Sequence, residues 1–161
     1  MNAIDLLEKQ HRLVEKLFRD FEAAEGDDDK KALFEQIADN LAVHCTIEER
    51  IFYPAVRARQ TEEQLEEAFD EHHDAKKIIL EALRDPDAPG FDGKVAALKG
   101  AIEHHVEEEE EELFASVRKL MTANALEALG QMMEAETLRL MQLGSPRLTI
   151  RLQPEPPVVQ P

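Results

Sequence analysis

Two histidines and two glutamates of this sequence form pairs at a spacing that could bind metal ions. Each pair has the form H-x-x-x-E: His44 with Glu48, and His105 with Glu109. A spacing of four residues places both side chains on one face of a helix, one turn apart. Imidazole with carboxylate suits iron, manganese or zinc, and no cysteine recurs beside the pairs to make a thiolate site. The pairs therefore indicate a metal centre inside a helical protein.

The two pairs are copies of each other within an internal repeat. An offset of 61 residues relates three pairs of candidate ligands: His11 and His72, His44 and His105, Glu48 and Glu109. Apolar residues follow the same offset, for example Leu41 and Ile102. Because the apolar residues fix which face of each helix turns inward, the repeat predicts two copies of one helix pair.

Each candidate ligand lies on the apolar stripe of its helix. The stripe around His11 includes Leu7 and Val14, at helical spacing. Four helices packed as a bundle would bring four imidazoles and two carboxylates together in the core. Burial of these groups without partners costs on the order of several kcal/mol for each uncompensated charge. Two metal ions with open coordination positions would compensate that cost.

Composition indicates an all-α protein and limits its partners. The 161 residues are 43% hydrophobic, rich in good helix formers and poor in glycine. The net charge of −16 argues against a nucleic-acid partner, because phosphate contacts need a basic surface. No apolar run is long enough to span a bilayer, and MNAIDLLEKQ lacks the basic start of a signal peptide. The single cysteine, Cys45, suits a reducing cytoplasm.

We expect four long helices and a shorter fifth in a single domain, residues 1–143. The expected helices are residues 3–24, 30–59, 61–84, 94–121 and 123–143, with a loop at 85–93. Pro54 should kink the second helix or end its regular part, and Thr61 should cap the third. Residues 144–161 hold five of the eight prolines, so they should form an extended or disordered tail outside the core. The tail could contact a protein partner, and LTIRL within it could dock as a strand.

The motifs QHRLVEKLF, HCTIEERIFYP, DEHHDAKKIIL and HHVEEEEEELF occur in this order. Together they resemble the hemerythrin-like family, also called HHE cation-binding domains, over residues 3–120. The resemblance implies an up-down-up-down four-helix bundle holding two non-haem iron ions with oxo and carboxylate bridges. Carried over residue by residue, it implies the metal ligands His11, His44, Glu48, His72, His105 and Glu109.

The sequence departs from the oxygen-carrying hemerythrins, which have an H-x-x-x-H pair on the third helix. Here the positions four residues from His72 are Ala68 and Lys76. The resemblance is therefore to the bacterial four-His, two-Glu type, which implies binding or reduction of oxygen, nitric oxide or peroxide. The alternative is an iron- or oxygen-sensing module without turnover. Spacing leaves two ligand alternatives open: Glu110 for Glu109, and His73 for His72.

Overall fold

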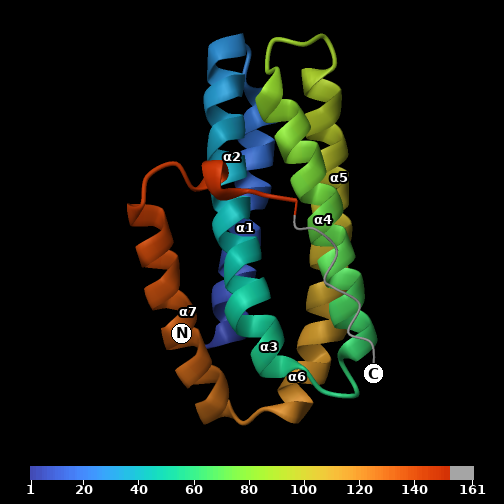
Figure 1. Ribbon diagram of the computed structural model, residues 1–161, viewed down its shortest axis with the longest axis vertical. Coiled ribbons are helices and arrows are strands. Elements are labelled where there is room, and N and C mark those ends of the chain that lie inside the picture. Colours follow the sequence, from blue (N-terminus) through green and yellow to red (C-terminus); the bar gives the residue numbers. More distant parts are fainter. Residues whose placement is uncertain (153–161) are drawn as a thin grey trace.

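The structure is a computed structural model that describes residues 1–152, and all regular elements in this range are helical (Figure 1). The long helices are α1 (Ala3–Ala23), α2 (Asp27–Ile47), α4 (Glu62–Arg84), α5 (Phe91–Glu108) and α7 (Ala123–Gln142). The short elements are the π-helical turns η1 (Glu48–Phe52) and η2 (Glu109–Leu113), the helices α3 (Tyr53–Val56) and α6 (Phe114–Leu120), and the 3-10 turn η3 (Pro146–Thr149). The predicted all-α class is confirmed.

Four of the long helices form the expected bundle. Helices α1, α2, α4 and α5 run side by side along the long axis, and each runs opposite to the one before it (Figure 1). Helix α1 packs on α2, and α4 packs on α5. The fifth long helix, α7, lies outside the bundle against α1 and α2. The α1/α2 side of the bundle is therefore covered, whereas the α4/α5 side is not covered by α7.

Two helices begin earlier than the sequence predicted. Helix α2 begins at Asp27, where three successive aspartates occupy the first turn, and negative charge is favourable at a helix N-terminus. Helix α5 begins at Phe91, so the last three residues of the predicted loop 85–93 are helical. Phe91 is buried, and its ring lies edge-on to Phe34, with 5.3 Å between ring centroids. This packing, which no local pattern reveals, extends the helix.

A π-helical turn interrupts each of the two helices that carry an H-x-x-x-E pair. The turns η1 and η2 begin at Glu48 and Glu109 and are related by the 61-residue offset. The predicted kink at Pro54 was wrong in its cause: the register changes at Glu48, before the proline. Ala115 occupies the position equivalent to Pro54 and also follows a π turn. π turns inside α-helices are frequent at functional sites.

Thr61 occupies the N-cap position of α4 as predicted, but its side chain makes no capping bond to that helix. Its buried hydroxyl donates to the carbonyl of Val56 and accepts from the backbone N–H of Ala58, each at 2.9 Å. The hydroxyl therefore fixes the turn after α3, and regular helix ends at Val56 instead of residue 59.

The core consists of two apolar clusters with the candidate ligands between them. One cluster lies around Phe34 and Leu98, and the other around Phe52 and Phe114. Helix α7 joins the second cluster and crosses the start of the chain at Gly130. A Cβ at Gly130 would lie 2.2 Å from the backbone oxygen of Met1, so this close approach needs glycine.

The predicted tail does not stay entirely outside the core. After Gly144 (φ +79°), the turn η3 docks on α2, and Ile150 is buried in the first apolar cluster. The backbone N–H and guanidinium of Arg147 donate to Asp39 at 2.8 and 3.0 Å. The segment therefore docks at Ile150, but with a 3-10 turn in place of the predicted extended tail or the alternative LTIRL strand. Residues 153–161 of the predicted tail lie outside the described residues. Among the described helices, none has the length and apolarity to cross a membrane.

Candidate metal centre

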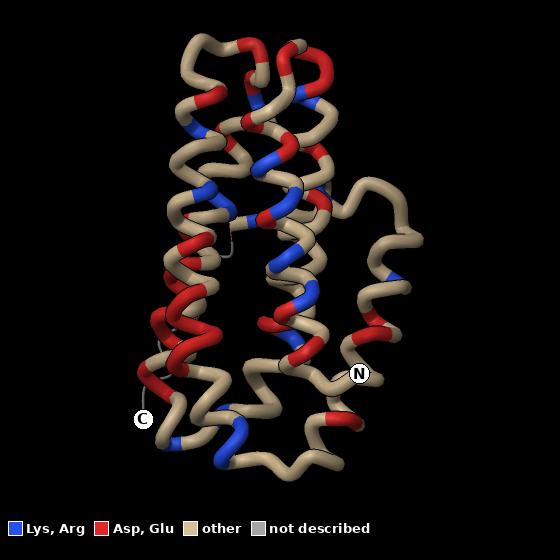
Figure 2. The backbone as a smooth tube through the Cα atoms, turned by 180° about the vertical axis from the view of Figure 1, so that it is seen from behind, with Lys and Arg blue, Asp and Glu red and all other residues tan. Residues whose placement is uncertain are grey.

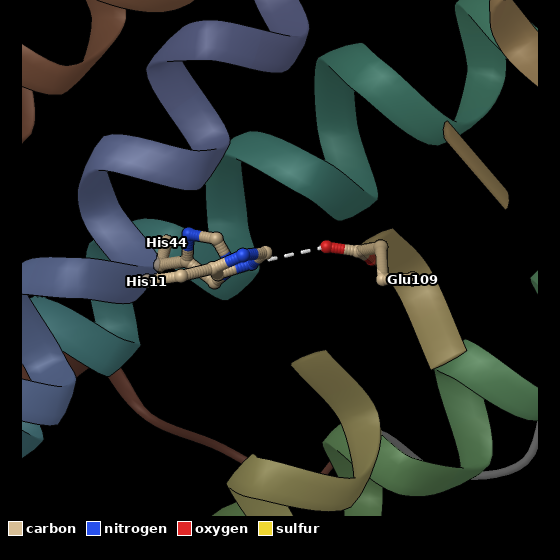
Figure 3. A group of neighbouring side chains, drawn as sticks. All are labelled: His11, His44 and Glu109. Carbon is tan, nitrogen blue, oxygen red and sulfur yellow. Dashed lines mark ion pairs between the residues drawn. The ribbon is translucent and has the colours of Figure 1, made fainter. Parts of the chain in front are cut away.

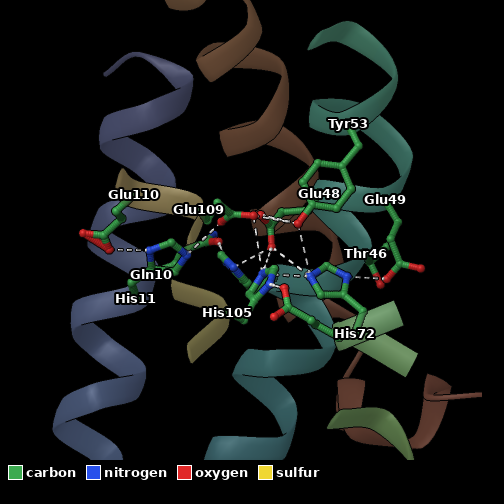
Figure 4. A network of polar contacts seen from close by, with 12 residues as sticks. Gln10, His11, Thr46, Glu48, Glu49, Tyr53, His72, His105, Glu109 and Glu110 are labelled. Carbon is green, nitrogen blue, oxygen red and sulfur yellow. Dashed lines mark hydrogen bonds and ion pairs between the residues drawn. The ribbon is translucent and has the colours of Figure 1, made fainter. Parts of the chain in front are cut away.

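All six predicted ligands lie close together inside the bundle. Figure 4 shows five of them: His11, Glu48, His72, His105 and Glu109. They come from four directions: His11 from α1, His44 and Glu48 from α2 and η1, His72 from α4, and His105 and Glu109 from α5 and η2. Each residue is at most 4% exposed. The helical phase deduced from the apolar stripes therefore places these side chains together.

The six residues form two neighbouring triads. The first contains His11, His44 and Glu109 (Figure 3). The second contains Glu48, His72 and His105. Within each triad, one potential ligand atom from each residue lies within 4.8 Å of the others. Each triad offers three potential ligand atoms for a metal ion.

The two carboxylates lie between the triads. Glu48 Oε1 is 3.3 Å from His72 Nε2 in its own triad and 2.7 Å from His44 Nε2 in the other. Glu109 Oε1 is 3.2 Å from His11 Nε2, and its Oε2 is 3.4 Å from His105 Nε2. Each carboxylate therefore lies close to a histidine of both triads.

The inward-facing atoms lack the hydrogen bonds that a metal-free core would require. Within the described part of the chain, the buried atoms His11 Nε2, His44 Nε2, Glu48 Oε1 and Glu109 Oε1 make no hydrogen bond of normal geometry. They face one another only as ion pairs, His11 with Glu109 at 3.2 Å and His44 with Glu48 at 2.7 Å. Buried polar atoms without partners are costly and rare. Neighbouring ligands bound at about 2.1 Å from one ion lie about 3.0–3.4 Å apart, which matches most of the separations above. The donor set therefore fits metal ions.

The outward-facing ring nitrogen of each histidine has an acceptor. The Nδ1 atoms of the four histidines donate to Glu110 (from His11, 2.9 Å), Gln10 (from His44, 2.6 Å), Glu49 (from His72, 3.0 Å) and Glu71 (from His105, 3.0 Å). When an imidazole is neutral, as metal binding requires, a proton on Nδ1 leaves the lone pair on Nε2 directed into the centre. Carboxylate partners of this kind orient metal-binding histidines and raise their basicity.

The sequence analysis did not identify these four hydrogen-bond acceptors, although they also follow the internal repeat. The 61-residue offset relates Gln10 to Glu71 and Glu49 to Glu110. Glu110, the alternative ligand, instead contacts the outer nitrogen of His11 and an arginine, Arg12. His73, the other alternative, is exposed, whereas His72 is buried.

Tyr53 makes the two halves of the centre unequal. Its buried hydroxyl donates to Glu109 Oε2 at 2.6 Å and lies 3.0 Å from Glu48 Oε2 and 3.3 Å from His72 Nε2. Burial and the two carboxylates raise the pKa of Tyr53 well above 10, so the phenol keeps its proton. The equivalent residue in the other half is Phe114, whose ring stacks on His11.

The charges of the equivalent histidines also differ. Burial opposes a positive charge on His105, but Glu109, Glu48 and Glu71 outweigh it and raise its pKa to about 10. Burial dominates at His44 and lowers its pKa, in spite of the nearby Glu48. The outer acceptor of His44 is the neutral amide of Gln10, whereas that of His105 is the carboxylate of Glu71. The amide supplies no charge to offset burial.

Comparisons with known proteins agree with this fold and donor set. The family model for the Hemerythrin HHE cation binding domain matches residues 2–117. An uncharacterized protein of Mycobacterium tuberculosis is 30% identical over 155 residues, which cover 94% of this chain and 93% of the relative. A protein of Nostoc sp. named DNA nickase is 29% identical over 144 residues, and the match covers 88% of this chain but only 41% of that relative.

A solved structure shows the same architecture. The crystal structure of a Hemerythrin HHE cation binding domain-containing protein from Mycobacterium kansasii superposes with a TM-score of 0.81. It is 25% identical in sequence, and the match covers 95% of each chain. The family match over most of the chain, the shared fold and the buried histidine–carboxylate centre agree. This chain belongs to the hemerythrin HHE cation-binding domain family.

Proposed function

We propose that this chain holds two iron ions between its two triads and uses them to bind or reduce oxygen, nitric oxide or peroxide. The observation that carries the proposal is the convergence of imidazole nitrogens and carboxylate oxygens that have no hydrogen-bond partner among the described residues. The ligands would be His11, His44 and Glu109 for one ion, and Glu48, His72 and His105 for the other. Mixed imidazole and carboxylate ligation suits iron.

The protein's own residues would prepare the centre for a small ligand. Bound iron would supply electrons and a Lewis acid. The Nδ1–H bonds hold each imidazole in one tautomer, and Tyr53 holds a proton at Glu109 Oε2, 2.6 Å away. That phenol is positioned to hydrogen-bond an oxygen or nitrogen atom bound between Glu48 and Glu109.

The space beside the centre favours a small ligand. A narrow cleft reaches His105 and Glu109 from the surface between α4 and α5, and it has room for about one water molecule. An organic substrate of ordinary size would require this part of the bundle to separate.

Spectroscopy of the iron-loaded protein tests this function. Metal-free protein would be loaded with ferrous iron without air and then mixed separately with oxygen, nitric oxide or hydrogen peroxide. We expect charge-transfer absorption of a ferric pair after oxidation, and at least one reagent either bound reversibly or reduced in proportion to the ferrous iron that is oxidised. Glu48→Gln should lose this response, whereas Glu111→Gln, the same change on the exposed face, should keep it. An iron-loaded wild-type protein that reacts with none of the reagents would refute the proposal.

One observation favours a second candidate function, sensing of iron or oxygen without turnover. The docked C-terminal segment shares a surface cleft with Glu49 and Lys76: Thr149, Ile150 and Arg151 line its other side. Glu49 in turn accepts from His72 Nδ1. If His72 moves when metal binds, Glu49 would move with it and change the wall of the cleft that the docked segment also lines.

Hydrogen exchange distinguishes the two functions. In a sensor, loading with iron should change the amide protection of residues 146–152 at least as much as that of α7. Equal protection of the segment with and without iron would exclude the sensing function and leave the reaction with small ligands.

A further inference from the structure

A second group of metal-binding residue types lies on the surface, one residue out of register with the inner centre. His104 and Glu108 form another H-x-x-x-E pair on α5, directly before His105 and Glu109 in the sequence. His104 Nε2 is 3.1 Å from Glu108 Oε1 and 3.3 Å from Glu71 Oε2 of α4. We call Glu71, His104 and Glu108 the outer cluster. One potential ligand atom from each lies within 4.8 Å of the other two.

Glu71 connects the outer cluster to the inner centre. While its Oε2 faces His104, its Oε1 accepts from His105 Nδ1 at 3.0 Å. The cleft between α4 and α5 has Glu71 and Glu108 in its wall and also reaches His105 and Glu109. Glu71 and Glu108 of the outer cluster therefore line the same cleft as His105 and Glu109 of the inner centre.

A polar atom without a partner lies along this cleft. Gln64 lines the cleft, and its buried Oε1 has no hydrogen-bond partner in the described range. Glu109, only 3% exposed, forms the inner end of the wall, where its Oε2 lies 3.4 Å from His105 Nε2. Oxygen atoms that lack donors are suited to contact a cation on its way inward.

The outer cluster is present in only one half of the repeat. The residues equivalent to Glu71, His104 and Glu108 are Gln10, Val43 and Ile47. Val43 and Ile47 are buried in the apolar cluster to which α7 contributes. The α1/α2 side is thus closed by α7, whereas the α4/α5 side carries the histidine and carboxylates. The bundle itself does not require them.

The surroundings of the outer cluster favour cations. Glu67 and Glu112 also line the cleft, and acidic residues gather along the end of α5 and on η2 (Figure 2). A concentration of one charge around a cleft attracts ions of the opposite sign. The mixture of one imidazole with carboxylates suits a divalent transition metal.

We propose that Glu71, His104 and Glu108 form an outer binding site for a divalent transition-metal ion, which takes the ion from solution and passes it along the cleft to the inner centre. The transfer rests on the proposed function of the inner centre, whereas binding at the outer cluster does not. His104 and Glu108 are then uptake residues and not ligands of the final centre.

Two measurements on the full chain test the proposal. In the first, iron-loaded protein is titrated with Mn²⁺, and free Mn²⁺ is followed by electron paramagnetic resonance. Wild-type protein and Glu111→Gln, the charge-matched control, should bind an additional ion. His104→Ala and Glu108→Gln should each bind it about 10-fold more weakly. If wild-type protein takes up no iron, the inner centre fails, and the same titration on metal-free protein still tests the outer cluster. Unchanged Mn²⁺ affinity in both variants would overturn the proposal.

In the second, uptake of ferrous iron by metal-free protein is followed in stopped flow without air, and the final iron content is measured. His104→Ala and Glu108→Gln should take up iron about 10-fold more slowly and reach the wild-type content. Glu111→Gln should match the wild-type rate. Equal slowing in Glu111→Gln would show that only the general surface charge matters. A wild-type rate in both cluster variants, or a lower final content in His104→Ala, would also overturn the proposal.

Discussion

Removal of the Tyr53 hydroxyl should destabilise the metal-free protein more than the iron-loaded protein. In the metal-free state the phenol is the hydrogen-bond donor between two buried carboxylates, 2.6 Å from Glu109 and 3.0 Å from Glu48. When iron binds the carboxylates, the metal compensates most of their charge. Tyr53→Phe should be tolerated sterically, because Phe114 occupies the equivalent position of the repeat.

The expected loss of stability in Tyr53→Phe can be estimated from the single proton of the phenol. The phenol has one proton, so it makes one strong bond at a time to a charged acceptor, and such a bond contributes about 1.5–3 kcal/mol. Taking about 2 kcal/mol, the thermal midpoint of metal-free Tyr53→Phe should fall by about 4–8 °C for a chain of this length. The loss in the iron-loaded protein should be less than half as large.

Urea unfolding of both states, at a fixed excess of iron for the loaded protein, measures the difference. Thr61→Val provides the control, because it also removes a buried hydroxyl. The hydrogen bonds of this hydroxyl go to the backbone of Val56 and Ala58, and neither residue is a candidate ligand. Its cost should be the same with and without iron. The reasoning would be refuted if Tyr53→Phe cost nothing in the metal-free protein, or cost the same in both states.

Three further predictions concern packing and charge. Gly130→Ala should destabilise the protein by about 1–3 kcal/mol in urea unfolding, because its Cβ would lie 2.2 Å from the backbone of Met1. Ile150→Ala should cost about 2 kcal/mol by the same assay and leave the iron content unchanged, since Ile150 is buried away from the ligands. The metal-free protein should lose stability as pH rises from about 6.5 towards 10, because His11 and His105 have pKa values of about 9 and about 10 in the folded state. The positive charge of these two histidines stabilises the folded state fully at pH values below the pKa of an unfolded histidine. This stabilisation is lost as the pH rises through the pKa of each histidine in the folded state. The iron-loaded protein should not show this loss, because metal binding requires neutral imidazoles. The measurement is the urea midpoint of both states at several pH values. A parallel loss of stability in the two states would contradict the prediction.

The repeat made the centre accessible to sequence reasoning. One offset related the candidate ligands and the apolar residues around them, so the helical phase was known even where HHVEEEEEE offered several choices. The structure brings those six side chains together. The same offset also relates Gln10 to Glu71, but the role of these residues depends on their distance to a histidine of another helix, which a sequence pattern does not contain.

The features that sequence reasoning missed arise from tertiary contacts. A π turn has no residue signature, as the equivalence of Pro54 and Ala115 illustrates. Ile150 is buried because η3 meets α2, although its segment is rich in turn-forming residues. Phe91 extends its helix because it packs against another aromatic ring. In each case a contact distant in sequence overrides the local preference.

The metal content of freshly purified protein tests the central claim most directly. Elemental analysis of the wild type should give about two irons per chain, the number expected for two imidazole–carboxylate sites. His44→Ala and His105→Ala should each lose most of that iron, whereas His104→Ala should retain it. Zinc or no metal in the wild type, with no iron taken up on loading, would contradict the account. So would a His104→Ala protein as depleted as His105→Ala, because the inward face of α5 would then be wrongly assigned.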